Sequence, residues 1–231
     1  MRKIVVLGLA TLMAVGAGSA RAADDESKCL AGRAKAWGTY EACVQKLFAA
    51  SVGLSNLDDA RLAKLDACVS KLAGTWSKLQ GLDDSATCGG LSRFVDNGST
   101  VTDRLTLLTW EKKSSASDDV GNYGDRRDPD NAYALTFDND DDGGAYNDFL
   151  ENLNAGTGFS DANSWRLPTL AELLTIRGVP EIGAYNPGKH WTRSLDQTNP
   201  GQAWRVHFGT PSIETAPKWG VNYTRAVRGG L

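Results

Sequence analysis

The sequence is poor in the residues that most enzymes use for covalent and acid–base chemistry. Only two of its 231 residues are histidine, His190 and His207, and no cysteine follows Cys88. It also lacks a Gly-x-Ser-x-Gly motif, a P-loop and a Gly-x-Gly-x-x-Gly motif after a strand. The usual sequence signals for a serine nucleophile and for nucleotide cofactors are therefore absent.

Long hydrophobic runs are also missing, apart from one near the N-terminus. Residues 1–3 are Met-Arg-Lys, residues 4–18 are mostly apolar, and small residues flank Arg21 before Ala23. This pattern predicts a signal peptide over residues 1–22 and a periplasmic or secreted protein. A transmembrane anchor is the alternative, but the run is shorter than the roughly 20 residues that a bilayer needs. After cleavage we expect no membrane span.

Cleavage would also change the charge of the protein. It removes three basic residues and no acidic residue, so the net charge goes from −3 to −6. Nucleic acids and other polyanions then become poor partners, because the bulk charge repels them.

The few cysteines all lie in the first third of the mature chain. An even number of cysteines in an exported protein predicts disulfides. A zinc site is disfavoured because no two of the four are separated by the two to four residues that such sites use. The pairing depends on the local secondary structure.

Apolar residues recur at helical spacing in two stretches of this region. The first helix is expected over about residues 26–49 and the second from Leu62 to Leu79, through a capping box at residues 55–58. The connection is short and contains Gly53, which favours an antiparallel helical hairpin over residues 23–90.

This hairpin decides between the possible cysteine pairings. Cys43 with Cys68 and Cys29 with Cys88 join positions at similar heights, whereas crossed pairings would join positions many turns apart. The sequence therefore predicts the nested pairing, with each bridge stabilising the hairpin by roughly 2 to 4 kcal/mol.

Strand patterns replace helical periodicity after the last cysteine, so a second domain is expected over residues 91–231. Residues 93–103 alternate apolar and polar side chains around Asn97-Gly98, which predicts a β-hairpin. Residues 106–110 are expected to form a further strand, and residues 111–131 to form a long polar surface loop.

Six segments of this second region occur in a specific order. They are RFVDNGSTVTDRLTLLTWEKK (93–113), GGAYNDFLENLNAGTGF (143–159), SWRLPTLAELLTI (164–176), HWTRS (190–194), AWRVHF (203–208) and YTRAVRGG (223–230). The order resembles the domain family named after the C-terminal domain of the Legionella collagen-like protein. The resemblance implies a C-type-lectin-like domain, an α+β architecture of twisted antiparallel strands with long loops and few helices.

The same resemblance implies adhesion or ligand binding at the cell surface rather than catalysis. Two positions depart from the family pattern. Leu107 stands where members commonly have glycine, so residues 106–110 are expected to be less tightly turned. Arg193 stands where they have a small hydroxyl residue, which changes the surface there.

The stretch WRLPTLAEL, residues 165–173, predicts a corner between a strand and a helix. Pro168 favours an extended residue before it, and Thr169 with Glu172 forms a capping box. Trp165 supplies a large buried area. Arg166 is interpreted mainly as a structural pin through its hydrogen-bonding fork, with ligand binding as the alternative.

An acidic run later in the chain resembles half of a calcium loop. Asp138, Asp140 and Asp142 alternate before Gly143, as in the first half of an EF-hand. The bidentate glutamate of that motif would stand at the position of Phe149. A solvated acidic loop is therefore favoured over a calcium site, and no other cofactor is expected.

These observations favour an exported, non-enzymatic binding or adhesion module of a bacterial envelope. Its ligand is left open as a cell-surface glycan, a peptide or a partner protein. The candidate ligand-binding residues are Arg166, Trp191, Arg193 and Trp204. Other exposed aromatics are expected at Trp219 and Tyr223, and Arg193, Arg205, Arg225 and Arg228 could form a local basic face.

A hydrolase on the same scaffold is the alternative function. It would use His207 or His190 as general base. Each histidine lies beside an aromatic residue in a strand-like segment, which explains both positions without catalysis.

Overall fold

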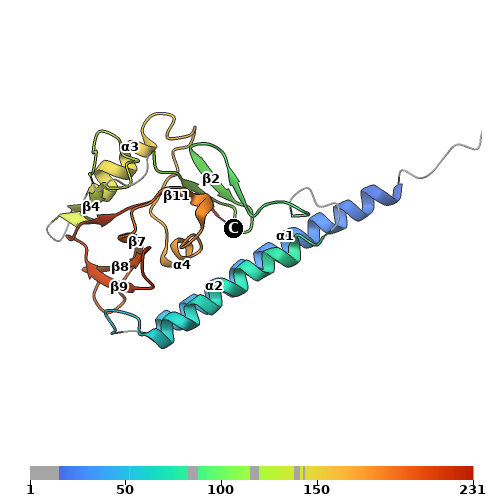
Figure 1. Ribbon diagram of the computed structural model, residues 1–231, viewed down its shortest axis with the longest axis horizontal. Helices are drawn as coiled ribbons and strands as arrows, with labels where there is room; N and C mark the ends of the chain where they lie inside the picture. Colours follow the sequence, from blue (N-terminus) through green and yellow to red (C-terminus); the bar gives the residue numbers. More distant parts are fainter. Residues whose placement is uncertain are drawn as a thin grey trace, which may run out of the picture.

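The computed structural model describes residues 16–51, 53–82, 88–114, 120–137, 141–142 and 144–230. The predicted α+β architecture is confirmed: a long helical hairpin precedes a region of short strands (Figure 1). None of the described helices is long and apolar enough to cross a membrane.

The hairpin consists of α1 (Gly16–Ala49) and α2 (Asp59–Leu79), which run antiparallel along one side of the strands (Figure 1). Helix α1 begins at Gly16 instead of at about residue 26, so it includes the segment around the expected cleavage point. Residues 1–15 of the expected signal peptide lie outside the described residues.

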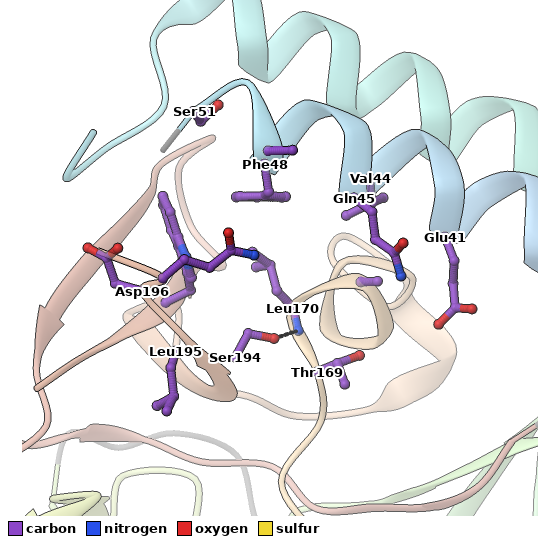
Figure 2. Close-up of a pocket in the computed structure, with 14 residues that line it drawn as sticks. Glu41, Val44, Gln45, Phe48, Ser51, Thr169, Leu170, Ser194, Leu195 and Asp196 are labelled. Carbon is purple, nitrogen blue, oxygen red and sulfur yellow. Dashed lines mark hydrogen bonds between the residues drawn. The ribbon is translucent and has the colours of Figure 1, made fainter. Parts of the chain in front are cut away.

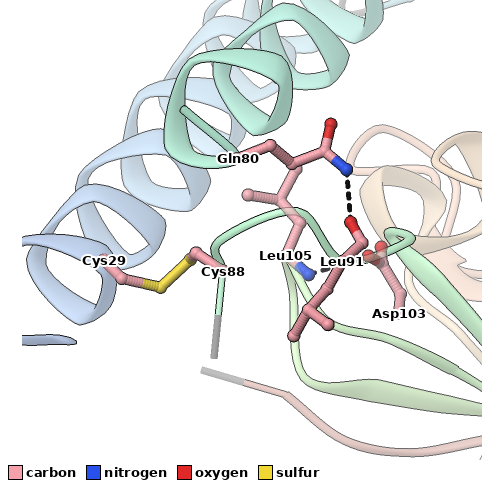
Figure 3. Close-up of a disulfide and its surroundings, with 6 residues drawn as sticks. All are labelled: Cys29, Gln80, Cys88, Leu91, Asp103 and Leu105. Atoms are coloured by element: carbon pink, nitrogen blue, oxygen red, sulfur yellow. Dashed lines mark hydrogen bonds between the residues drawn. A yellow bond between two sulfur atoms is a disulfide. The ribbon is translucent and has the colours of Figure 1, made fainter. Parts of the chain in front are cut away.

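The nested disulfides are confirmed. Cys43–Cys68 crosses the middle of the hairpin, and Cys29–Cys88 ties α1 to the segment after α2, with Cα–Cα distances of 6.1 Å and 6.0 Å. Figure 3 shows that Gln80, at the end of α2, donates to the carbonyl of Leu91 beside the second bridge. The hairpin is thus fixed to the segment just before the first strand of the following region.

The start of α2 differs from the prediction. Asp58 alone is the N-cap, and its carboxylate accepts the backbone N–H of Arg61 at 2.8 Å. Ser55 cannot cap, because the backbone before Asp58 extends β9 (Ile213–Pro217): Thr215 N–H donates to the Ser55 carbonyl at 2.7 Å. The connection between the helices therefore belongs to a sheet edge.

The strands form two main sheets. The first is antiparallel with the order β1-β2-β3-β11. Its members are β1 (Phe94–Asp96), β2 (Thr100–Asp103), β3 (Leu108–Glu111) and β11 (Val227–Gly229). The predicted β-hairpin is confirmed, since Phe94 pairs with Asp103 and Gly98 has a φ of 82° in the turn.

The second sheet has the order β4-β10-β7-β8-β9. Its members are β4 (Ala132–Tyr133), β10 (Asn222–Tyr223), β7 (Lys189–Leu195), β8 (Gln202–His207) and β9. Its pairs are antiparallel except β10 with β7, which is parallel and was not predicted. A small third sheet joins β5 (Thr136–Phe137) to β6 (Asp141–Asp142).

Short helices connect these sheets. The π-helix η1 (Ala145–Leu150) continues into α3 (Glu151–Asn154), followed by α4 (Leu170–Leu174) and the 3-10 helix η2 (Pro180–Ile182). Between β2 and β3, Leu107 has a φ of 59°, the left-handed conformation that glycine adopts easily. Leu107 N–H donates to the Asp103 carbonyl at 2.8 Å. The expectation that this turn is looser than in members with glycine stays a prediction.

The hairpin and the strands share a hydrophobic core. One cluster of buried side chains contains Leu65 and Trp76 of α2 together with Leu173 of α4 and Val206 of β8. Across this boundary, the Tyr40 hydroxyl donates to the Ala171 carbonyl at 2.7 Å. Helix α1 is therefore packed on the β-rich region, and the boundary between them is the place where a groove can form.

Candidate ligand-binding groove

The corner at residues 165–173 is built around an ion pair. Arg166 donates two hydrogen bonds to the Glu172 carboxylate, at 2.6 and 2.7 Å. Glu172 also accepts the Thr169 N–H at 2.7 Å, and the Thr169 hydroxyl accepts the Glu172 N–H at 3.2 Å, which confirms the capping box. Burial would raise the pKa of Glu172, but the hydrogen bonds from Arg166 and Thr169 lower it.

These contacts place Arg166 in a structural role. Its guanidinium also donates to the Gly229 carbonyl at 3.2 Å, so it joins the start of α4 to β11. Trp165 beside it is buried, and its indole N–H donates to the Phe159 carbonyl at 2.8 Å. A ligand that reached Arg166 would have to compete with Glu172 for the same donors.

The corner holds α4 beside the end of β7. The Ser194 hydroxyl accepts the Leu170 N–H at 2.9 Å, and the Arg193 N–H donates to the Pro168 carbonyl at 2.8 Å. Helix α1 passes over this junction, as Figure 2 shows. Three segments that are distant in the sequence therefore meet at one place.

A groove of about 520 Å³ lies at this junction. Phe48 of α1 and Trp204 of β8 form part of its wall, with ring centroids 5.0 Å apart in an edge-to-face arrangement. Leu170 and Val44 add apolar surface. The volume lies in the range of small-ligand sites, which are commonly clefts with apolar walls and a few polar groups.

The polar lining of the groove is acidic. Among the described residues, Glu41 and Asp196 line it, and no lysine or arginine does. Burial and the nearby Glu172 carboxylate raise the pKa of Glu41. One oxygen of Asp196 accepts the N–H and the hydroxyl of Thr198, both at 2.8 Å. Such a lining favours a neutral or cationic group over an anion.

Only one of the four predicted ligand-binding residues lines this groove. Trp204 does so, although it is only 7% exposed. Trp191 is 0% exposed and its indole N–H donates to the Tyr133 carbonyl at 2.8 Å, so the expectation of an exposed ring was wrong. Strand β7 directs the side chain of Trp191 into the core. Arg193 is exposed outside the groove lining.

The contribution of α1 to the groove was not predicted from the sequence. Glu41, Gln45 and Phe48 lie on the side of the helix that faces the β-rich region, whereas Cys43 faces α2. The signal was present in the sequence: Leu47 and Phe48 are adjacent and both apolar, so α1 has apolar residues on more than one side. A helix of this kind packs against two partners.

The two histidines lie in different surroundings. His190 is fully buried and stacks on Phe208, and burial together with the positive charges of Arg225 and Lys113 holds its pKa well below the ordinary value. The His207 Nδ1 accepts the N–H groups of Gly209 and Thr210, at 3.1 and 3.0 Å. Within the described ranges, no hydrogen bond joins either imidazole to a carboxylate or a hydroxyl.

The calcium prediction is not tested. Asp138 and Asp140 lie outside the described residues, and only the backbone of Asp142 is described. Among the residues that the structure describes, no group of three or more His, Cys, Asp or Glu side chains is placed to hold a metal ion.

The basic face considered for the C-terminal strands does not form. Arg205 pairs with Glu214 at 2.8 Å, and Arg225 is fully buried and donates to backbone carbonyls. The Arg228 guanidinium lies over the Trp165 ring at 5.3 Å. These arginines are used in internal contacts. Trp219, by contrast, is 69% exposed at a loop between β9 and β10.

A comparison with protein families accounts for most of the β-rich region. The model of the Lcl C-terminal domain family matches residues 99–228, from the first β-hairpin to β11. A search of curated proteins finds no match. The family match covers more than half of the chain and leaves out both helices of the hairpin. The chain therefore belongs to the Lcl C-terminal domain family.

Proposed function

We propose that the protein is an exported, non-enzymatic binding module of a bacterial envelope, and that its ligand binds in the groove between α1 and the β-rich region. The observation that carries this proposal is the groove itself. Its wall combines the Phe48–Trp204 aromatic pair with two carboxylates, the mixture of apolar surface and a few polar groups that ligand sites use.

Two features support export. Disulfides persist in oxidising compartments outside the cytosol, and both predicted bridges are formed. Cleavage before Ala23 would also place Asp24, Asp25 and Glu26 in the first turn of α1. Acidic residues stabilise that end of a helix, where the backbone N–H groups carry partial positive charge.

Binding is favoured over catalysis by the chemistry of the groove. Ser194 is a candidate nucleophile in the groove, but its hydroxyl oxygen accepts the Leu170 N–H. Neither histidine lines the groove. A serine nucleophile needs an adjacent base to accept its proton. The acidic lining further favours ligands that are neutral or carry a cationic group over sulfated or phosphorylated ones.

The proposal is tested by filling the groove. Gln45 is exposed on α1 and lines the groove, whereas Ala42 is exposed on the same helix and does not. Ligands are first identified by screening the full mature chain on arrays of glycans and of envelope peptides. Gln45→Trp is expected to weaken binding at least about tenfold, and the matched control Ala42→Trp to leave it unchanged.

Two outcomes would contradict the proposal. Binding that survives Gln45→Trp would place the ligand elsewhere on the molecule. Turnover of an ester, glycoside or peptide substrate that is lost in His207→Ala would instead support the hydrolase alternative.

A further inference from the structure

The helical hairpin has a second, open side that the groove described above does not use. Tyr40, Phe48 and Asp66 contact the β-rich region from one side of the hairpin. Two hollows, of about 330 and 500 Å³, run between α1 and α2 and are lined mainly by other helical positions. They meet at Cys43–Cys68 and Lys71, which line both. We call them together the lysine-rimmed groove.

The rim of this groove is mainly basic. Five exposed lysines line it: Lys35, Lys46, Lys64, Lys71 and Lys78. Within the described part of the chain, none of the five has an ion-pair partner. The one acidic residue of the lining, Asp58, pairs with Arg61 of the same rim. This concentration stands out in a protein whose net charge is −3.

The lysines are spaced along the length of the hairpin. Lys64, Lys71 and Lys78 follow one another every seven residues, which corresponds to about 10 Å along the axis of α2. The Cys43–Cys68 bridge fixes the register of the helices and so places Lys46 of α1 near the level of Lys64. The rim is therefore positive on both sides.

The floor of the groove is apolar, and its edge on α2 carries small side chains. Ala36 and the buried Leu47 and Leu72 line it, with the exposed Ala60 and Ala67 at its edge on α2. The hydroxyls of Thr39 and Thr75 donate to carbonyls one turn earlier in their own helices, so they offer no free proton to a ligand. Small residues at a helix surface allow another helix to approach to the 8–10 Å typical of packed helices.

We propose that the lysine-rimmed groove binds an acidic amphipathic α-helix of a partner protein, which packs on α1 and α2 as a third helix. The apolar seam of that helix would cover the alanines, and glutamates or aspartates on its flanks would pair with the lysines. The groove runs from Gly32 of α1 to Ala50, just after the end of α1, a length of about 27 Å that suits a helix of roughly five turns. This proposal is independent of the ligand in the other groove.

Other occupants fit the groove less well. A second copy using the same face would bring two lysine rims together, and their repulsion opposes such a symmetric dimer. A linear polyanion would form ion pairs with the lysines but would leave the apolar floor exposed to water. A flat anionic membrane could contact the rim but could not enter the groove between the helices.

The test uses a synthetic 18-residue peptide with a leucine and alanine seam flanked by glutamates. Binding to the full mature chain is followed by fluorescence anisotropy at low salt, and helix formation by circular dichroism. We expect binding with a gain of helix, and weaker binding at high salt because the rim charges are screened. The same peptide with lysine flanks, or with a central proline, is expected not to bind.

Two variants separate charge from shape. Lys71→Gln is expected to weaken binding about threefold, the size of effect typical of an exposed ion pair, whereas Lys218→Gln, outside the groove lining, leaves it unchanged. Ala67→Trp fills the groove without changing the charge and is expected to weaken peptide binding at least about tenfold. Gln45→Trp in the other groove is expected to leave peptide binding unchanged.

Three results would overturn the proposal. Absence of peptide binding at low salt would remove it directly. Peptide binding that Ala67→Trp leaves intact would show that the groove does not hold a helix. Equal or tighter binding of unstructured poly-L-glutamate, or of vesicles rich in anionic lipid, would show that the lysines form a general polyanion or membrane surface instead.

Discussion

Replacing Glu172 by glutamine tests whether the corner at residues 165–173 is held by its ion pair. Glu172 is 6% exposed and accepts hydrogen bonds from both Arg166 and Thr169. Removing one partner of a buried ion pair costs about 3–5 kcal/mol. That figure must be reduced here, because the Arg166 side chain is 28% exposed and water can reach it, and because glutamine can still accept the Thr169 N–H. We therefore expect Glu172→Gln to lower the free energy of unfolding by about 2 kcal/mol at neutral pH.

The effect should depend on pH in a definite direction. The folded-state pKa of Glu172 is lowered, so its carboxylate is stabilised in the folded protein relative to the unfolded chain. This contribution is fully present above the unfolded pKa, near 4.5, and is lost as the pH falls through the lower folded value. The difference in stability between the wild-type protein and Glu172→Gln should therefore be largest at neutral pH and shrink in acid.

Urea unfolding of both proteins at neutral and acidic pH measures this difference. Glu181→Gln is the matched control, because Glu181 is exposed in η2 and has no ion pair with any described residue. A difference below about 0.5 kcal/mol at neutral pH, the range of ordinary surface substitutions, would refute the structural role of the pair. A difference that persists unchanged in acid would refute its ionic origin.

Four further predictions follow from the sequence and the fold. Intact mass of the exported protein should correspond to a chain that starts at Ala23, and a fraction that retains Met1 would contradict the signal peptide. Leu107→Gly should raise the free energy of unfolding by about 0.5 kcal/mol in denaturant titrations, because the strain of a left-handed leucine is removed and exceeds the entropic cost of glycine. A decrease in the free energy of unfolding of more than about 1 kcal/mol would contradict this prediction. Replacing Cys43 and Cys68 together by alanine should cost about 3 kcal/mol, and replacing Cys29 and Cys88 should cost more, because that bridge closes a loop of 59 rather than 25 residues; the reverse order would count against the entropic account. Millimolar calcium should leave the melting temperature unchanged, as a solvated acidic loop implies, and a rise that Asp140→Asn abolishes would show a calcium site.

Local patterns in the sequence predicted local structure well, because the physics that they reflect is local. The hairpin disulfides, the Asn97-Gly98 turn and the Thr169–Glu172 capping box each depend on residues whose spacing fixes their geometry. The parallel pairing of β10 with β7 could not be read from spacing, because it joins Tyr223 to His190 across the domain. The burial of Trp191 also depends on a distant residue, because its indole N–H donates to the carbonyl of Tyr133.

The candidate site was missed for a related reason. Its walls come from α1, α4, β7 and β8, and their meeting depends on how the hairpin docks. The sequence pattern predicts residues 23–90 and 91–231 as separate units, and it does not show which residues of the helix face the strands. Trp204 alone was found, because it is an aromatic residue in a segment already considered for binding.

Part of the groove lies outside the region that matches the family, so ligands should be sought with the full mature chain. The family match starts at residue 99, whereas Glu41, Gln45 and Phe48 of the groove lie in α1, outside it. Without α1, Trp204 would lose its edge-to-face partner and the carbonyl of Ala171 would lose the Tyr40 hydroxyl, leaving an exposed apolar surface in place of a groove. A fragment limited to residues 91–231 is therefore expected to bind hydrophobic dyes and to lose the ligand of the full mature chain. If the fragment retained that ligand with unchanged affinity, the site would lie wholly within the family domain, and the hairpin would have no part in recognition there.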